Sequence, residues 1–102
     1  MGEIPTFYID SANRKLVEGK TFEITHVGNR SLGWMLTINS VKIRMAQNQA
    51  TFKIVDPMSG LEEDVALFNG PDGNLVPRAH NGRRFTDALL SLGDCKNCKL
   101  ID

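Results

Sequence analysis

The stretch of sequence from Gly33 to Val55 contains three runs in which apolar residues alternate with mostly polar ones. The runs are Trp34–Ile38, Val41–Met45 and Ala50–Ile54. A period of two is typical of strands that bury one face, because successive side chains of a strand point to opposite sides. The stretch is therefore predicted to form three strands.

The apolar side chains of the three runs lie on the same face of a sheet if each strand pairs antiparallel with the next one along the chain. A two-residue turn at Asn39-Ser40 and a four-residue loop over 46–49 place the apolar side chains of all three strands on one face. Trp34 and Phe52 lie on that inward face in this register. The sequence thus predicts a three-stranded antiparallel meander whose other face meets solvent.

Shorter patterns predict the rest of the sheet. Alternation at Phe7 and Ile9 predicts a first strand, after which residues 11–14 have the composition of a turn. Three further apolar segments are read as strands: Lys15–Val17, Thr21–Thr25 and Val65–Phe68.

The only helix that the sequence predicts runs from Arg83 to Leu92. Its apolar residues recur at i, i+3, i+4 and i+7, and Gly93 stands where a helix C-terminus would use a left-handed residue. Before it, Asn69–Gly82 is predicted to be a long irregular loop, because proline and glycine recur along it. Loops of this length are often functional.

These elements predict a single domain over 1–102 of the α+β class, mostly β. The expected architecture is an antiparallel meander sheet, or a small partly closed barrel, of about six strands with one C-terminal helix packed on it. At 102 residues the chain is long enough to bury a core without disulfide staples.

Charge and hydropathy narrow the classes of function. Basic and acidic residues both number 12, so no net charge draws the chain to nucleic acid or to an anionic membrane. No apolar run is long enough to cross a membrane, and Met1–Pro5 lacks the basic start and apolar segment of a signal peptide. An intracellular, cytoplasmic protein with no membrane partner is expected.

The outward face of the predicted meander carries Lys42 opposite Lys53, with Arg44 nearby. Like charges directly opposed across a ladder destabilise it, so a basic pair there indicates an anionic ligand or an acidic partner. The alternative is a solvated face whose lysines discourage edge pairing. The small number of cations favours this alternative.

A second basic group consists of Arg78, His80, Arg83 and Arg84, at the end of the long loop and the start of the predicted helix. A helix N-terminus suits a phosphate or a carboxylate. Equally, Arg83 and Arg84 are read as exposed side chains in a first turn, where the helix dipole slightly disfavours cations. The sequence leaves both interpretations open.

The segment Cys95-Lys96-Asn97-Cys98 has the spacing of half a zinc site. Four ligands would require His80 and His26, or a second copy of the chain. Free thiols are the favoured interpretation, ahead of zinc, and a disulfide or redox pair comes last. Redox-active pairs open a helix, whereas these cysteines follow the predicted one. No other cofactor is expected.

No acid and base pair that would support catalysis is visible in the sequence, so an enzyme is not expected. The predicted function is a non-enzymatic interaction protein, of inhibitor or adaptor type, that docks onto an acidic protein surface through the basic β-sheet face and the long loop over 69–82. The alternative is a small nucleic-acid-binding protein that contacts phosphates. Both use the same residues: Lys42, Arg44, Lys53, Arg78, Arg83 and Arg84. The size suits an accessory or virus-encoded protein, and a homo-oligomer remains open.

Overall fold

The computed structural model describes residues 4–19, 21–56, 59–70 and 73–101. Over these residues the chain is mostly β, with two mixed sheets, one α-helix and no closed barrel. The prediction of an α+β, mostly β fold with one helix packed on a sheet is confirmed at this level. No helix among the described residues has the length and apolar character to cross a membrane.

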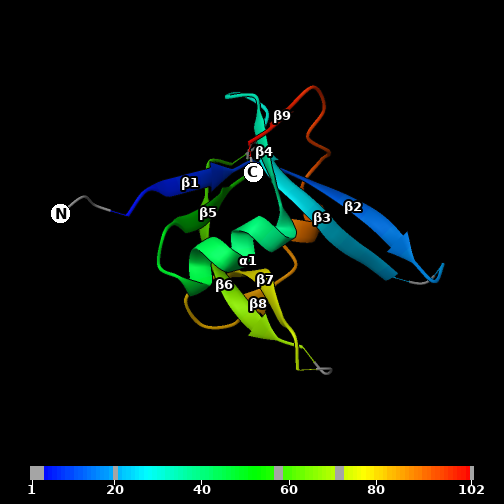
Figure 1. The fold of residues 1–102 in the computed structure, drawn as a ribbon, viewed down its shortest axis with the longest axis vertical. Coiled ribbons are helices and arrows are strands. Elements are labelled where there is room, and N and C mark those ends of the chain that lie inside the picture. The colour runs from blue at the N-terminus through cyan, green and yellow to red at the C-terminus, as the bar shows by residue number, and fades with distance from the viewer. Residues whose placement is uncertain (1–3, 20, 57–58, 71–72, 102) are drawn as a thin grey trace.

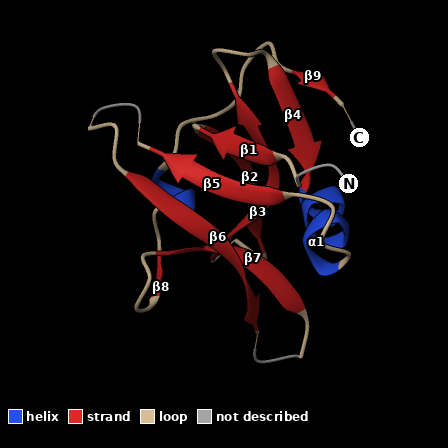
Figure 2. Ribbon diagram, turned by 90° about the vertical axis from the view of Figure 1, so that its left-hand side faces the viewer, coloured by secondary structure: helices blue, strands red, loops and turns tan. Residues whose placement is uncertain are grey.

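The first sheet has five strands in the order β1-β5-β6-β7-β8, and Figure 2 shows β1, β5, β6 and β7 side by side. Its central ladders are antiparallel, whereas β1 runs parallel to β5. The strands are β1 (Thr6–Ile9), β5 (Thr51–Val55), β6 (Glu62–Asn69), β7 (Leu75–His80) and β8 (Phe85–Thr86).

The second sheet has four strands in the order β2-β3-β4-β9. They are β2 (Ser11–Val17), β3 (Thr21–Asn29), β4 (Trp34–Thr37) and β9 (Lys99–Leu100). The β2–β3 hairpin extends away from the helix, and β9 lies beside β4 at the end of the molecule opposite to β6, β7 and β8 (Figure 1). Only Asp10 separates β1 from β2, so the chain passes directly from one sheet to the other.

The core lies between the two sheets and the helix α1 (Ile38–Ala46). Its largest fully buried side chains come from both sheets and from the helix: Ile9, Val27, Leu36, Val41 and Phe52. A short 3-10 helix, η1 (Leu89–Ser91), adds Leu89 to the same cluster.

The predicted meander is wrong, because its middle strand is the helix α1. Thr37 caps the helix N-terminus, where its hydroxyl accepts from the Ser40 backbone N–H at 3.3 Å. At the other end Asn48 adopts a φ of 54°. The N–H groups of Asn48 and Gln49 donate to the carbonyls of Met45 and Arg44. This pair of bonds is a Schellman motif, so the residues expected to form hairpin turns instead begin and end a helix.

The helical conformation also changes which side chains are buried. Ile38, Val41 and Met45 recur at i, i+3 and i+7 and pack in or against the core. Ile43, which the strand interpretation placed inward, is 46% exposed. A run of nine residues satisfies both the strand and the helix pattern at most positions, and the caps decide between them.

The predicted helix over Arg83–Leu92 is also wrong. Phe85 and Thr86 instead form β8, where they pair with His80 and Ala79 of β7. The Thr86 hydroxyl also donates to a Glu63 carboxylate oxygen at 3.1 Å, which holds β8 to β6. Backbone groups bonded across a ladder are not available for a helix, and only the short η1 follows.

The expected irregular loop over 69–82 contains the regular strand β7. Pro77 is tolerated because β8 covers only Ala79 and His80, which leaves the rest of β7 as an edge. The Gly70 N–H donates to the Asn74 carbonyl, and alternation along the ladder then turns position 77 away from β6. The missing proline N–H therefore costs no hydrogen bond to β6.

The turn expected over 11–14 is also part of a strand. These residues belong to β2, which pairs with β3 through an irregularity between Asn13 and Arg14.

Candidate binding groove

A groove of about 540 Å³ lies between α1, β7 and the segment around η1. Most of its lining is apolar, and a few polar groups stand among the apolar side chains. The apolar residues are Ile24, Ile38, Leu75, Val76, Pro77, Leu89 and Leu90, and the polar ones are Glu23, Lys42, Asn74, Arg78 and Thr86. Apolar walls with a few polar groups are the usual composition of a binding site.

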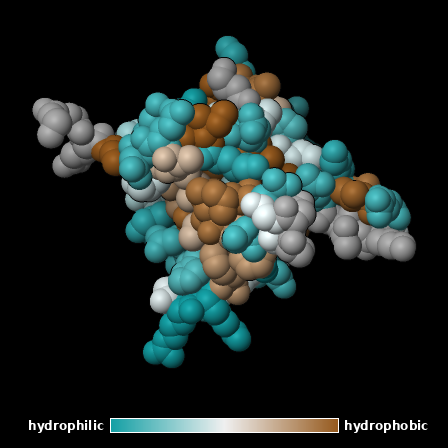
Figure 3. All heavy atoms as spheres, turned by 60° about the horizontal axis from the view of Figure 1, so that its bottom comes forward, coloured by the Kyte–Doolittle hydropathy of each residue, from teal (hydrophilic) through white to brown (hydrophobic). Residues whose placement is uncertain are grey.

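Part of the apolar lining is open to solvent. Leu75 is 44% exposed, Val76 41% and Leu90 40%. Figure 3 brings the lower end of Figure 1 forward and shows apolar atoms gathered at the centre of that face, with hydrophilic side chains around them. A single exposed leucine requires no explanation, but several around one groove are typical of an interaction site.

Two of the residues singled out from the sequence meet at this groove. Lys42 comes from α1 and Arg78 from β7, and these two elements pack beside each other. Lys42 follows Ile38 by four residues, so one turn of helix places both side chains on the groove side of α1. Within the described ranges Lys42 forms no ion pair.

The position of Arg78 is fixed by its neighbours. Its guanidinium lies 4.7 Å from the ring centroid of Phe68 and 5.9 Å from that of Phe85, and an Nη2 atom lies 3.2 Å from Asp87 Oδ1. Phe68 and Phe85 contact each other edge to face. Cation–π contacts of this kind orient the guanidinium plane, and Asp87 is exposed enough for solvent to weaken the ion pair.

Arg44 and Lys53 lie elsewhere. Arg44 points along α1, where its Nε donates to the Ser40 hydroxyl at 3.2 Å and its guanidinium lies 5.8 Å from the Phe7 ring. Lys53 stands on β5 with Glu62 and Asp64 each 3.9 Å from its Nζ. The expected pairing of Lys42 with Lys53 is wrong, since one residue is helical and the other has acidic partners.

Arg83 and Arg84 are exposed in the loop between β7 and β8. Their backbone N–H groups donate to the Asn81 side-chain oxygen at 3.0 and 3.1 Å. Asn81 thus accepts the bonds expected of a capping residue, but no helix follows it. The helix N-terminus that was expected to attract an anion at these arginines is therefore absent from this loop.

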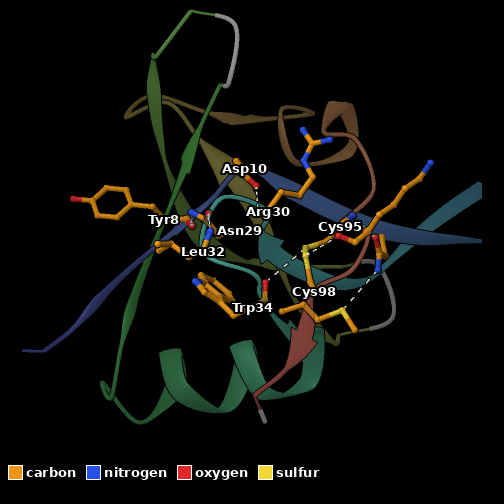
Figure 4. Close-up of a disulfide and its surroundings, with 11 residues drawn as sticks. Tyr8, Asp10, Asn29, Arg30, Leu32, Trp34, Cys95 and Cys98 are labelled. Atoms are coloured by element: carbon orange, nitrogen blue, oxygen red, sulfur yellow. Dashed lines mark hydrogen bonds between the residues drawn. A yellow bond between two sulfur atoms is a disulfide. The ribbon is translucent and has the colours of Figure 1, made fainter.

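Cys95 and Cys98 are joined by a disulfide, and Figure 4 shows the bond beside Trp34. The sulfurs bonded to each other are not thiolates, so the zinc hypothesis applies only to a reduced chain. His26 Nδ1 lies 2.9 Å from the Thr25 hydroxyl, and His80 Nδ1 accepts from the Gly82 N–H. Among the described residues no three metal-binding side chains cluster.

Sequence patterns did not mark several of the groove residues as candidates for a binding site. Leu75 and Val76 fell in the stretch expected to be a loop, and Leu90 was assigned to a helix that does not form. Glu23 gave no signal, because an acidic residue in an exposed position of a strand is ordinary. What recruits these residues is the packing of α1 beside β7, which joins segments far apart in the chain.

A separate hollow of about 570 Å³ has the opposite charge. Asp56, Glu62 and Glu63 line it, together with apolar residues that include Leu61 and Leu92. The chain therefore carries a groove bordered by cations and a hollow bordered by carboxylates, although its net charge is zero.

Comparison with protein-family models, with curated proteins and with solved structures finds no match for this chain.

Proposed function

We propose that this chain is a non-enzymatic protein-interaction module, and that the groove between α1 and β7 binds an acidic, partly apolar segment of a partner protein. The observation that carries the proposal is that Lys42 and Arg78, from two different elements, border one apolar groove. The apolar walls supply contact area, and the two cations select the charge of the segment.

The charge of the groove supports an acidic partner. Lys42 and Arg78 outnumber the single carboxylate of Glu23, and Asp87 only partly offsets Arg78 because it is well exposed. Lys42, which forms no ion pair within the described ranges, is the cation most available to a partner. A partner carboxylate near its Nζ would then gain a charge-assisted bond beside apolar contacts.

The edge of β7 favours docking through side chains over the addition of a strand. Position 77 turns away from β6, toward the open edge, and proline offers no N–H there. A strand laid along this edge would lose a backbone bond at its centre. The partner segment is therefore expected to place apolar side chains between Leu75, Val76 and Leu90.

The distribution of the other cations supports a protein partner over nucleic acid. Of the six basic residues considered, only Lys42 and Arg78 line the groove. Lys53 has two carboxylates close by, and Arg44 lies over Phe7. A phosphate backbone requires several cations along one path, since each contact adds its own counterion release.

A peptide-display selection on the full chain tests the proposal. Random peptides retained by the wild type are expected to be enriched in Asp or Glu next to large apolar residues. Lys42→Glu is expected to weaken the best of these peptides by about tenfold, because it replaces an attraction by a repulsion. The matched control is Lys99→Glu, the same charge change on the exposed strand β9, no residue of which lines the groove.

Two results would contradict the proposal. One is a selection without acidic enrichment. The other is a pair of variants, Lys42→Glu and Lys99→Glu, that lose equal affinity. Binding of single-stranded or duplex DNA, with an affinity that falls steeply as salt rises, would replace the protein partner by a nucleic acid.

A further inference from the structure

Cys95 is held in place by contacts that do not depend on its disulfide. Its side chain is buried, at 6% exposure, and its backbone N–H donates to the Asn13 side-chain oxygen at 2.7 Å. Just before it, the Gly93 carbonyl accepts from the Ala12 N–H at 3.0 Å. The chain is therefore fixed to β2 up to Cys95.

The segment after Cys98 is held much less firmly. Strand β9 has two residues, both exposed, and pairs in parallel with β4 as the last strand of its sheet. The Lys99 N–H donates to the Gly33 carbonyl at 2.8 Å, and the Ile101 N–H donates to the Met35 carbonyl at 3.0 Å. A strand this short is marginal without another link to the fold. The Cys95–Cys98 bond supplies that link.

We propose that Cys98 is a thiol–disulfide exchange site, and that reduction by a dithiol releases β9 from the edge of β4. Cys98 is half-buried whereas Cys95 is buried, so an attacking thiolate reaches the Cys98 sulfur first. This inference is independent of the proposed groove, because no residue of β4 or β9 lines that groove.

The exchange proceeds in two displacements. The reductant thiolate bonds to Sγ of Cys98, the Cys95–Cys98 bond breaks, and Sγ of Cys95 leaves as a thiolate that takes up a proton. The second thiol of the reductant then displaces Sγ of Cys98, which also takes up a proton, and the reductant becomes a cyclic disulfide. Two electrons and two protons pass from the dithiol to the cysteine pair.

The two cysteines respond differently to reduction. Sγ of Cys95 already lies 3.6 Å from the Trp34 carbonyl oxygen, and Figure 4 marks this contact. A disulfide sulfur has no proton to donate there, but the thiol formed by reduction does. Cys95 thus gains a bond to β4 that keeps it in place. Cys98 Sγ lies 3.6 Å from the Lys96 carbonyl oxygen, only two residues away in the chain, so a thiol there gains no link to the rest of the fold.

Reduction is expected to act locally. The disulfide closes a loop of only a few residues, so it constrains the unfolded chain little and is not a staple for the whole fold. Once β9 leaves, the carbonyls of Gly33, just before β4, and of Met35, on its outer edge, lose their partners. An open edge of this kind is able to pair with a strand from another chain.

Amide hydrogen exchange on the full chain, oxidised and then treated with dithiothreitol, tests this proposal. The Lys99 and Ile101 amides are expected to exchange at least tenfold faster in the reduced protein, while the Val27 amide in β3 keeps its rate. Iodoacetamide is expected to modify Cys98 at least tenfold faster than Cys95. Cys98→Ser, which has no bond to reduce, should show fast Lys99 and Ile101 exchange with and without dithiothreitol.

Three results would overturn the proposal. One is equal exchange of Lys99 and Ile101 in the oxidised and reduced protein. Another is faster exchange at Val27 as well, because the disulfide would then stabilise the whole fold. The third is equal or faster modification of Cys95, which would contradict the asymmetry between the two sulfurs.

Discussion

The Sγ atom of Cys95 occupies the space beside Gly28 in which any other residue would place its Cβ. A Cβ on Gly28 would lie 2.5 Å from that sulfur and 2.6 Å from the Trp34 carbonyl oxygen. The first neighbour belongs to a disulfide and the second to the backbone of β4, so neither is a flexible side-chain end. Gly28 is required here for close approach and not for a positive φ.

Gly28→Ala is therefore expected to destabilise the fold by about 1–3 kcal/mol, the usual range for forcing atoms into a packed interior. Urea unfolding of the oxidised protein measures the change. Gly93→Ala is the control, because its Cβ would meet nothing closer than the Arg30 side chain at 3.7 Å. Equal stability of the Gly28→Ala variant and the wild type would show that β3 and β4 are not this close.

Truncations on α1 distinguish a helix from a strand at positions 41 and 43. Val41 is fully buried, so Val41→Ala is expected to cost about 2 kcal/mol in the free energy of unfolding. Ile43 is 46% exposed, so Ile43→Ala should cost well under half as much. A strand would give both residues the same face and similar losses. Urea unfolding of the two variants provides the measurement, in which the denaturant dependence of the unfolding free energy (the m-value) should match that of the wild type.

Replacement of Asn48 tests the Schellman motif at the end of α1. Asn48→Ala is expected to lower stability by about 1 kcal/mol, because its φ of 54° is strained for alanine and accessible to asparagine. Asn48→Gly keeps that conformation accessible and should leave the unfolding midpoint nearly unchanged. If alanine and glycine behaved alike at this position, the left-handed end of the helix would be in doubt.

The hydroxyl of Ser11 offers a prediction of the opposite sign. Ser11 is fully buried at the start of β2, and its Oγ has no hydrogen-bond partner among the described residues. In the unfolded chain the Ser11 hydroxyl bonds to water, and folding buries it without a partner that replaces this bond. Ser11→Ala removes that cost, so the free energy of unfolding should stay the same or rise by about 1 kcal/mol. A thermal melt measures this. A loss of more than about 1 kcal/mol would reveal a partner for the hydroxyl.

The alternation of apolar and polar residues correctly predicted the strands that bury only one face. Thr6–Ile9, Trp34–Thr37 and Thr51–Val55 are strands as expected, and Phe52 is buried as expected. Over 38–46 the same alternation also satisfies a helix, and Ile43 is the residue that separates the two patterns. Local periodicity is too short there to decide, whereas the bonds at Thr37 and Asn48 decide it at once.

The candidate site was only partly accessible from sequence. Lys42 and Arg78 were singled out, but Lys42 was paired with Lys53 on a face that does not form. The helix at 83–92 failed because Phe85 and Thr86 found ladder partners in β7, which is a nonlocal gain that the amphipathic pattern does not encode. The disulfide ranked last among the interpretations of the cysteine pair. The spacing of the two cysteines alone does not distinguish free thiols, zinc ligands and a disulfide bond.

By itself the sequence determined the fold class and most strands, because a period of two in apolar residues follows from the geometry of a single strand. It also determined the neutral net charge and the supply of basic residues. The tertiary structure decided which of those residues meet. Lys42 and Arg78 share a groove because α1 packs beside β7, and Cys95 sits over Gly28 because β3 lacks a Cβ there. Such contacts join residues far apart in the chain, and their energies depend on packing that no local pattern records.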